Sequence, residues 1–297
     1  MTSSLPGVVP SGLLLVDKPG AITSHGAVAA ARRALGTRKI GHAGTLDPMA
    51  TGLLILGVER ATRLLGHLAL HDKEYLATIR LGSTTVTDDA EGEIIAQAPD
   101  SLLDQVTELA IDQAMHALSG VIQQVPSSVS AIKVDGKRSY ARVRAGENVE
   151  LKARTVTVSR FERTQVRREI DAFDIDVHVE CTTGTYVRAL ARDLGEALGV
   201  GAHLTMLRRT RIGAFSVDGA TSIESLGLQG LIPIAEAARA CFPSWVLSDE
   251  DADHVSHGRR IPLHLETPTA LFAPGGEVLA LAESDGDGLR YFAVFVG

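Results

Sequence analysis

Cysteine is nearly absent from this sequence. Two cysteines, Cys181 and Cys241, occur among 297 residues, and they lie far apart in the chain. They match neither a disulfide framework nor a CxxC metal motif. Because disulfides are typical of secreted proteins, this scarcity favours a reducing compartment, and we predict a cytoplasmic protein.

The sequence also has no long hydrophobic run. Its longest aliphatic stretch, residues 53–56, is far shorter than the ~20 residues that a membrane-spanning helix needs. The N-terminal sequence MTSSLPGVVPSG has neither the basic segment nor the apolar segment of a secretory signal. We therefore predict no membrane partner.

Charge of one sign does not prevail along the chain, although the net charge at pH 7 is −7. Residues 1–70 hold seven basic and three acidic residues, and residues 131–216 hold sixteen and eleven. The segments 71–130 and 217–297 are acidic, with two basic against ten acidic and four against twelve. RNA binding depends on local positive potential, so the two basic blocks leave an RNA partner open. Ordinary solvated surfaces explain the same pattern, and charge alone does not decide.

Hydrophobic periodicity predicts an α+β protein. From Phe173 to Cys181 every second residue is apolar, which is typical of a half-buried strand. Helical spacing follows from Val187 to Leu198, and Gly199 ends that helix. Strands and helices follow one another irregularly, which favours α+β over a regular alternation.

The remaining chain predicts further elements and a second domain. Thr23 or Ser24 caps a helix that Gly36 ends, and Ile111, Met115 and Leu118 mark the inner face of another helix. We also expect strands at 13–16, 53–58 and 75–81, a helix at about 61–70, and loops at 41–52 and 83–93. From about residue 240, short strand-like pieces in an acidic, Gly/Pro-rich context predict a small β domain.

The segment GHAGTLDPMATG, residues 41–52, is the densest candidate site. It holds three glycines and the carboxylate of Asp47, and loops of this kind often carry functional groups on a rigid scaffold. An Asp before a Pro is also a common turn element, and the dipeptide alone leaves both interpretations open. The spacing of a phosphate-binding P-loop is missing.

Metal and hydrolase motifs are weak or missing. His67 and His71 lie four residues apart, but the glutamate of a HExxH motif is absent. His254 and His257 lie in the acidic tail. No GxSxG motif occurs. We interpret these histidines as surface residues and predict no metal site.

Five segments of the chain carry a stronger signal. They are LLLVDKPGAITSH, GHAGTLDPMATG, KEYLATIRLGSTT, VPSSVSAIKVDGKRSYARVRAG and CTTGTYVRALARDLGEALGVGAHLTMLRRTRIG. In this order they resemble the TruB-type tRNA pseudouridine synthases, from residue 12 to about residue 215. The resemblance implies a mixed-sheet catalytic domain at residues 1–238 and a small β-rich RNA-binding module of the PUA type at residues 239–297.

The resemblance implies that Asp47 is the nucleophile of a reaction that converts uridine into pseudouridine. It places Arg188 beside Asp47, where a permanent cation keeps the carboxylate ionised. Tyr75 is expected to stack on the target uracil, and Tyr186 to remove a proton or to position the base. Leu207 is expected in the apolar wall of the pocket. The reaction is redox-neutral, so no cofactor is expected.

The implied partner is tRNA, with the uridine at position 55 of the T-arm as the target. His42, on the same loop as Asp47, is expected to contact the RNA near the flipped nucleotide. Phosphate contacts, which position RNA without reading its sequence, are expected from Lys18, Arg38, Lys39, Lys133, Arg208 and Arg209. No obligate protein partner is expected, and the lack of a coiled-coil pattern favours a monomer.

Two positions depart from the pattern of that family. Val129 stands where a tyrosine is usual, and Val86 where an acidic residue is common. Neither belongs to the expected catalytic set. Three other functions stay open: a synthase guided by a separate RNA and partner proteins, an RNA-folding factor whose catalysis is secondary, and a metallohydrolase built on His67 and His71.

Overall fold

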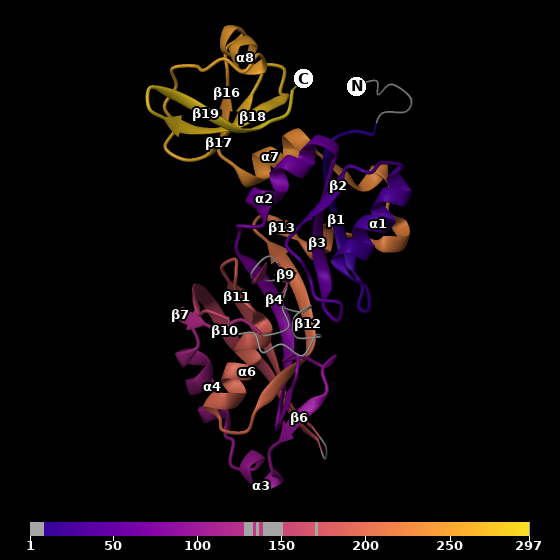
Figure 1. Ribbon diagram of the computed structural model, residues 1–297, viewed down its shortest axis with the longest axis vertical. Coiled ribbons are helices and arrows are strands. Elements are labelled where there is room, and N and C mark those ends of the chain that lie inside the picture. Colours follow the sequence, from indigo (N-terminus) through magenta and orange to yellow (C-terminus); the bar gives the residue numbers. More distant parts are fainter. Residues whose placement is uncertain (1–8, 128–132, 135–136, 139–150, 170–171, 297) are drawn as a thin grey trace. The chain divides into compact units, whose positions relative to one another are not determined.

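The computed structural model describes residues 9–127, 133–134, 137–138, 151–169 and 172–296. The chain divides into two compact units, and Figure 1 colours it by position in the sequence. Unit 1 comprises Met1–Pro48, Gly52–Leu70 and Ile212–Gly297, and unit 2 comprises Met49–Thr51 and His71–Arg211.

Unit 1 is built on a mixed sheet. Its strands are β1 (Gly12–Lys18), β2 (Ile40–Ala43), β3 (Thr51–Val58), β13 (Phe215–Ser216), β14 (Thr221–Ser222) and β15 (Leu231–Pro233). β1 pairs antiparallel with β3 and β15, whereas β14 runs parallel to β1. Nearly every residue of β1 and β3 is buried, which explains why both are continuous aliphatic runs in the sequence.

Helix α1 (Ser24–Leu35) begins and ends where the sequence predicts. The Thr23 hydroxyl accepts a hydrogen bond from the Gly26 N–H at 3.0 Å, and Gly36 ends the helix with a φ of 68°. The other helices of unit 1 are η1 (Glu59–Leu64), α2 (Leu65–Leu68), η2 (Val217–Gly219), η3 (Ile223–Ser225), η4 (Leu228–Gly230), α7 (Ile234–Cys241) and α8 (Asp249–Ser256). The helix predicted at 61–70 is therefore a 3₁₀ helix, η1, that continues into a short α-helix.

The C-terminal part of unit 1 is a four-stranded sheet, which confirms the predicted β-rich region. Its strands are β16 (Ser244–Val246), β17 (Thr269–Phe272), β18 (Val278–Asp285) and β19 (Gly288–Val294). Phe272 and Phe295 share one buried core with Ala238 of α7 and Leu13 of β1. The boundary predicted after residue 238 falls inside α7 and stays a prediction.

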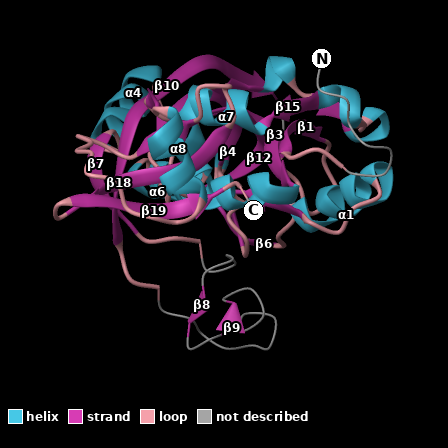
Figure 2. Ribbon diagram, turned by 90° about the horizontal axis from the view of Figure 1, so that it is seen from above, coloured by secondary structure: helices cyan, strands magenta, loops and turns pink. Residues whose placement is uncertain are grey.

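Unit 2 contains the strand order β12-β4-β11-β10-β7. Its strands are β4 (Lys73–Leu81), β5 (Ser83–Thr85), β6 (Ile94–Gln97), β7 (Gly120–Gln124), β8 (Lys133–Val134), β9 (Lys137–Arg138), β10 (Arg154–Glu169), β11 (Ala172–Cys181) and β12 (Ala202–Ile212). Its helices, cyan in Figure 2, are α3 (Asp100–Leu103), α4 (Glu108–Ala117) and α6 (Val187–Ala197). β4, β11, β10 and β7 pair antiparallel.

Strand β11 confirms the alternating pattern between Phe173 and Cys181. Its odd-numbered residues are buried and its even-numbered residues are partly exposed. Ile111 and Met115, on the predicted inner face of α4, are buried as well. None of the helices within the described ranges is long and apolar enough to cross a membrane.

The loop predicted at 41–52 is shorter in the structure, because β2 and β3 take up its two ends. Gly41 and Gly57 lie opposite each other in these strands. A Cβ atom on Gly57 would lie 2.8 Å from the Ala61 carbonyl oxygen, and one on Gly41 would lie 2.9 Å from Leu65. These two glycines therefore permit η1 and α2 to pack closely on the strands and do not mark a turn.

Candidate functional site

Asp47 lies in the loop of residues 44–50, which joins β2 to β3. These strands pair antiparallel, with His42 opposite Leu56, so the loop is a hairpin connection. Gly44 and Gly52 have φ angles of 82° and 95°, which disfavour any residue with a side chain. The two glycines fix the course of the backbone on either side of Asp47, which is itself half-buried.

A buried hydroxyl holds the residue before the nucleophile candidate. Ser24, at the start of α1, donates to the Leu46 carbonyl at 3.1 Å and accepts from the Leu46 N–H at 2.9 Å. Its exposed fraction is 1%. Both backbone polar groups of Leu46, its N–H and its carbonyl, are therefore hydrogen-bonded to α1.

A buried lysine holds the residue after it. The ammonium of Lys18 donates to three carbonyl oxygens, those of Pro19 (2.8 Å), Ile22 (2.8 Å) and Pro48 (3.2 Å). Lys18 is 0% exposed, so these bonds satisfy a charge that burial would otherwise destabilise. The structure thus places Lys18 inside unit 1, and its burial does not support the phosphate contact predicted for it.

His42 lies on β2, directly before the loop of Asp47. It is half-buried, and its ring meets the ring of His25 edge-on, with centroids 5.4 Å apart. The predicted RNA contact of His42 stays a prediction, and its place on the hairpin keeps it close to the candidate nucleophile along the chain.

Arg188 lies in the first turn of α6 and is 4% exposed. Its Nη1 donates to the Thr87 carbonyl at 2.8 Å and lies 3.4 Å from Oδ2 of Asp89. Asp89 is also buried, and it accepts further hydrogen bonds from the Thr87 hydroxyl (2.5 Å) and the Glu91 N–H (3.0 Å). The carboxylate of Asp89 therefore orients the guanidinium of Arg188.

The same acidic loop holds a second arginine of α6. Asp88 has a φ of 59°, which residues other than glycine seldom adopt, and its Oδ2 lies 3.5 Å from Nη1 of Arg192. Burial raises the pKa of Asp88 above its usual value, and the charge of Arg192 offsets this only in part. Val86, which departs from the family pattern, is exposed, and the contacts to α6 come from the residues after it.

Tyr186 is the N-cap residue of α6 and directly precedes its first turn. Its N–H donates to Gln124 Oε1 at 2.8 Å, and its carbonyl accepts from Gln124 Nε2 at 3.1 Å. Gln124 is buried at the end of β7. No local sequence pattern indicates this anchor, because the two residues lie 62 positions apart in the chain.

The other predicted residues of unit 2 are placed as follows. Tyr75 is buried on β4, and Leu207 and Arg209 are buried on β12, whereas Arg208 is half-buried. Burial suits a pocket wall for Leu207, and their predicted roles stay predictions. Lys133 lies on β8 with its side chain outside the described residues, and Val129 lies wholly outside them.

A lysine that was not among the predicted site residues lies two positions before Tyr75. Lys73 is buried, and its ammonium donates to the His71 carbonyl at 2.8 Å. Burial, helped by the charge of Arg209, lowers the pKa of Lys73 to about 8. Burial also raises the pKa of the Cys181 thiol, which lies opposite Lys73 on β11, to about 11.

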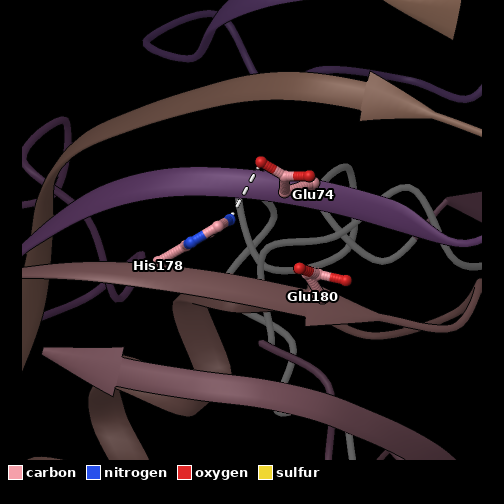
Figure 3. Close-up of side chains that lie close together, drawn as sticks. All are labelled: Glu74, His178 and Glu180. Carbon is pink, nitrogen blue, oxygen red and sulfur yellow. Dashed lines mark ion pairs between the residues drawn. The ribbon is translucent and has the colours of Figure 1, made fainter.

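A polar cluster lies on the side of β4 opposite to Lys73 and Tyr75. It is the candidate metal site among the residues that the structure describes. Glu74, His178 and Glu180 each offer a ligand atom within 4.8 Å of the others (Figure 3). His178 Nε2 already lies 2.9 Å from Glu74 Oε1. Arg211 places its Nε 3.0 Å from Glu74 and its Nη2 3.3 Å from Glu180. The guanidinium thus supplies the cation that two carboxylates need, and the cluster fits an ion-pair network better than a metal.

Two of the histidines noted in the sequence make other contacts in the structure. The ring of His67 packs against the rings of Phe292 and Phe242, at centroid distances of 4.7 and 5.9 Å. His67 is therefore part of an apolar contact within unit 1 and not the surface residue that the sequence suggested. His257 binds the backbone carbonyl of Asp253 at 2.8 Å.

Comparison with protein-family models finds three consecutive matches. Residues 32–187 match the TruB family pseudouridylate synthase N-terminal domain, and residues 188–232 match the tRNA pseudouridylate synthase B C-terminal domain. Residues 242–296 match the tRNA pseudouridine synthase II C-terminal model.

Curated relatives match over nearly the whole chain. The tRNA pseudouridine synthase B of Leifsonia xyli is 52% identical over 97% of this chain and 98% of its own length. That of Thermobifida fusca is 53% identical over 96% and 99%. Both relatives carry the same name, and the match covers nearly the whole length of each.

Solved structures with the same fold come from larger assemblies. A Cbf5–Nop10–Gar1 complex contains a chain with a TM-score of 0.69 and 27% identity, over 96% of this chain and 84% of that one. The Cbf5 chain of an archaeal Nop10–Cbf5 complex has a TM-score of 0.71 and 26% identity, over 97% and 87%. These matches confirm the predicted α+β fold with a mixed sheet and a β-rich C-terminal region.

Proposed function

The chain belongs to the TruB family of pseudouridylate synthases and is an isomerase that converts uridine to pseudouridine in tRNA, and we propose that its target is the uridine at position 55 in the T-arm, with Asp47 as the nucleophile. The observation that carries the proposal is the loop of Asp47. This carboxylate lies between two residues whose backbones are held by the buried Ser24 and Lys18. A carboxylate on a fixed loop suits a nucleophile that must meet one atom of its substrate.

The isomerisation sets three chemical requirements. The uracil must leave the ribose C1′, turn, and reattach through C5, after which the C5 proton is removed. No electron is gained or lost overall, so the chain's own side chains suffice for our mechanism. A nucleophile, a surface that holds the detached base, and a proton acceptor are required.

In our proposal Asp47 attacks and Arg188 stabilises its charge. An ionised carboxylate in a closed pocket needs a cation, and a guanidinium stays charged at any pH in use. Arg188 enters this role already oriented by Thr87 and Asp89. Preorganisation of this kind removes the need for the arginine to rearrange during the reaction.

The remaining residues receive the base and the RNA. A uridine inside a folded arm must be flipped out, which costs a few kcal/mol, and stacking on Tyr75 and apolar contact with Leu207 offset that cost. Tyr186 takes the C5 proton or positions the base. The proposed RNA contacts come from His42, Lys133 and Arg208, whereas the burial of Arg209 does not support the contact predicted for it.

We further propose that the enzyme works as a monomer in the cytoplasm, without a protein partner. The Cbf5 chains that share its fold are found with Nop10 and Gar1, and one such particle is bound to a substrate RNA. The relatives that match end to end are each named tRNA pseudouridine synthase B, and their identity to this chain, 52% and 53%, is far higher.

The test uses an unmodified tRNA transcript with tritium at C5 of its uridines. The purified protein alone should release tritium, and carbodiimide-blocked primer extension should stop at one site in the T-arm. Asp47→Asn should release none while still binding the transcript, and Asp100→Asn, on the exposed surface of α3, serves as the matched control. Release by Asp47→Asn would remove the nucleophile from the proposal, and a stop outside the T-arm would change the target.

A further inference from the structure

Gln124 is a buried polar residue at the end of a strand that is mostly exposed. On that strand, β7, Val121 is 73% exposed whereas Gln124 is 1% exposed. Burial of an amide is unfavourable unless its oxygen and its nitrogen both find hydrogen-bond partners, and an apolar side chain would fill the same space without this requirement. The glutamine at this position therefore has a role other than the burial of surface.

Both groups of this amide bind the same residue, Tyr186. Gln124 Oε1 accepts from the Tyr186 N–H at 2.8 Å, and Gln124 Nε2 donates to the Tyr186 carbonyl at 3.1 Å. The two bonds lie on either side of the Cα atom of Tyr186, so together they restrict its φ and ψ angles, which are −107° and 108°. The direction in which the phenol leaves the backbone is fixed with them.

The start of α6 is held from outside the helix. Tyr186 is its N-cap residue, and the Tyr186 side chain makes no capping hydrogen bond. In a capping box, a Glu or Gln at the third helical position binds the N–H of the N-cap residue. Ala189 occupies that position in α6, and Gln124 makes the equivalent bond from β7. Because the Tyr186 carbonyl also accepts from the Leu190 N–H at 3.2 Å, Gln124 binds the carbonyl that starts the helix.

The backbone around Gln124 is itself held on two sides. Gln124 lies opposite Arg154 where β7 pairs with β10. The carbonyl of the next residue, Val125, accepts from Nη2 of Arg192 on α6 at 2.7 Å. The amide of Gln124 therefore extends from a fixed point, and it can hold Tyr186 in one place.

We propose that Gln124 is a positioning residue for pseudouridine formation, because its amide holds the backbone of Tyr186 so that the phenol meets the detached uracil in one orientation. This inference rests on the proposed function, in which Tyr186 takes the C5 proton or positions the base. Gln124 is buried and acts only through Tyr186. Its loss should therefore slow the chemical step and leave the affinity for tRNA unchanged.

The first experiment compares the parent protein with Gln124→Met, which removes both hydrogen bonds at a similar side-chain volume. The control is Gln123→Met, at the exposed neighbour whose amide binds the Thr155 hydroxyl at 2.7 Å. Because a misplacement of about 1 Å can cost on the order of 100-fold in rate, single-turnover tritium release by Gln124→Met should be about 10- to 100-fold slower than by the parent. Its Kd for tRNA should equal that of the parent, and the control should match the parent in both.

The second experiment uses Gln124→Glu, which differs from the parent in one group. The ionised carboxylate can accept from the Tyr186 N–H and has no proton to donate to the carbonyl, whereas the protonated acid can do both. Burial raises the pKa of a carboxyl, so the protonated share should grow between pH 8.5 and 5.5. The rate of the variant relative to the parent, per folded protein, should rise over this range by about 2- to 10-fold, which corresponds to one hydrogen bond. The parent has the same charged neighbours, so this ratio reports the introduced carboxyl; they are Arg154, Arg188, Arg192, Asp193 and Asp88.

The third experiment repeats Gln124→Met in a Tyr186→Phe protein. If Gln124 acts through the phenol of Tyr186, its loss should slow this background by about twofold or less. Equal slowing in both backgrounds, a raised Kd with a normal single-turnover rate, or a ratio for Gln124→Glu that does not change with pH would each overturn the proposal. The pH ratio decides alone if Gln124→Met does not fold. Failure of the proposed function would show separately, as absence of tritium release by the parent protein.

Discussion

The loop that carries Asp47 and the helix turn that carries Arg188 are held in place by different means. In unit 1, Ser24 and Lys18 bind backbone atoms of the residues on either side of Asp47. In unit 2, Asp89 binds the side chain of Arg188 itself. The first arrangement fixes the backbone of the loop and leaves the carboxylate of Asp47 available to react. The second fixes the guanidinium of Arg188 and contributes little to the position of the backbone.

This difference predicts different consequences for mutation. Loss of a backbone anchor leaves main-chain polar groups without a hydrogen-bond partner. It should therefore lower the free energy of unfolding more than the activity. Loss of a partner from a buried ion pair leaves a charge without compensation, so it affects both. Each of the following substitutions tests one side of this comparison.

Removing Arg188 should have the largest effect. Arg188→Met leaves the carboxylate of Asp89 buried and unpaired, which should lower the free energy of unfolding by roughly 3–5 kcal/mol. Tritium release should fall below detection. The double variant Asp89→Asn/Arg188→Met should regain most of the stability and none of the activity, as urea denaturation and tritium release would show. Recovery of activity in the double variant would rule out a direct catalytic role for Arg188.

Asp89→Asn should have the next largest effect. Hydrogen bonds to charged groups contribute roughly 1.5–3 kcal/mol, so a misoriented Arg188 should reduce kcat about 10- to 100-fold. KM should change little, because Asp89 does not touch the RNA in our proposal. The matched control is Asp193→Asn, which removes a carboxylate that pairs with Arg192 on the same helix. A raised KM with normal kcat would instead place Asp89 among the RNA contacts.

Ser24→Ala tests the backbone side of the comparison. Its loss leaves the N–H and the carbonyl of Leu46 without their buried partner, which should cost roughly 1–3 kcal/mol of unfolding free energy. The activity of the folded fraction should fall less than in Asp89→Asn. Ser101→Ala, at an exposed position of α3, is the control. A large loss of activity at an unchanged free energy of unfolding would show that Ser24 acts mainly by positioning the loop for catalysis and not by stabilising the fold.

The sequence predicts the local features of both arrangements. Thr23 and Gly36 set the ends of α1, and the alternation in β11 gives its buried face, because caps and periodicity are local. The motif around Asp47 likewise marked the loop. These signals need no knowledge of distant parts of the chain.

The sequence did not predict how the site is supported. Lys18 was predicted to contact phosphate, and only the fold brings three carbonyl oxygens around its ammonium. Asp89 belonged to a loop expected to be merely polar and acidic, yet it is buried against Arg188, about a hundred residues further along the chain. Contacts across such separations are set by tertiary structure, which local patterns do not encode.

The smallest expected effect concerns the network around Glu74. Burial raises the pKa of Glu74, but its hydrogen bonds with Arg211, His178 and Thr210 outweigh burial and lower its pKa below the usual 4.5. A carboxylate with a lowered pKa in the folded state contributes stability that is fully present above its unfolded pKa. That contribution is lost as the pH falls through the folded value.

Glu74→Gln should therefore weaken the acid dependence of unfolding, because the unfolded parent gains a proton below pH 4.5 that the variant does not take up. Urea denaturation at pH 7, 5, 4 and 3 measures the effect, with Glu162→Gln at a more exposed carboxylate on β10 as the control. The parent should lose more stability than the variant between pH 5 and 3, and the control should follow the parent. Equal losses in all three proteins would show that the pKa of Glu74 is normal and that the network on this face of β4 is too well solvated to shift it. Tritium release at pH 7 should be unaffected in either case.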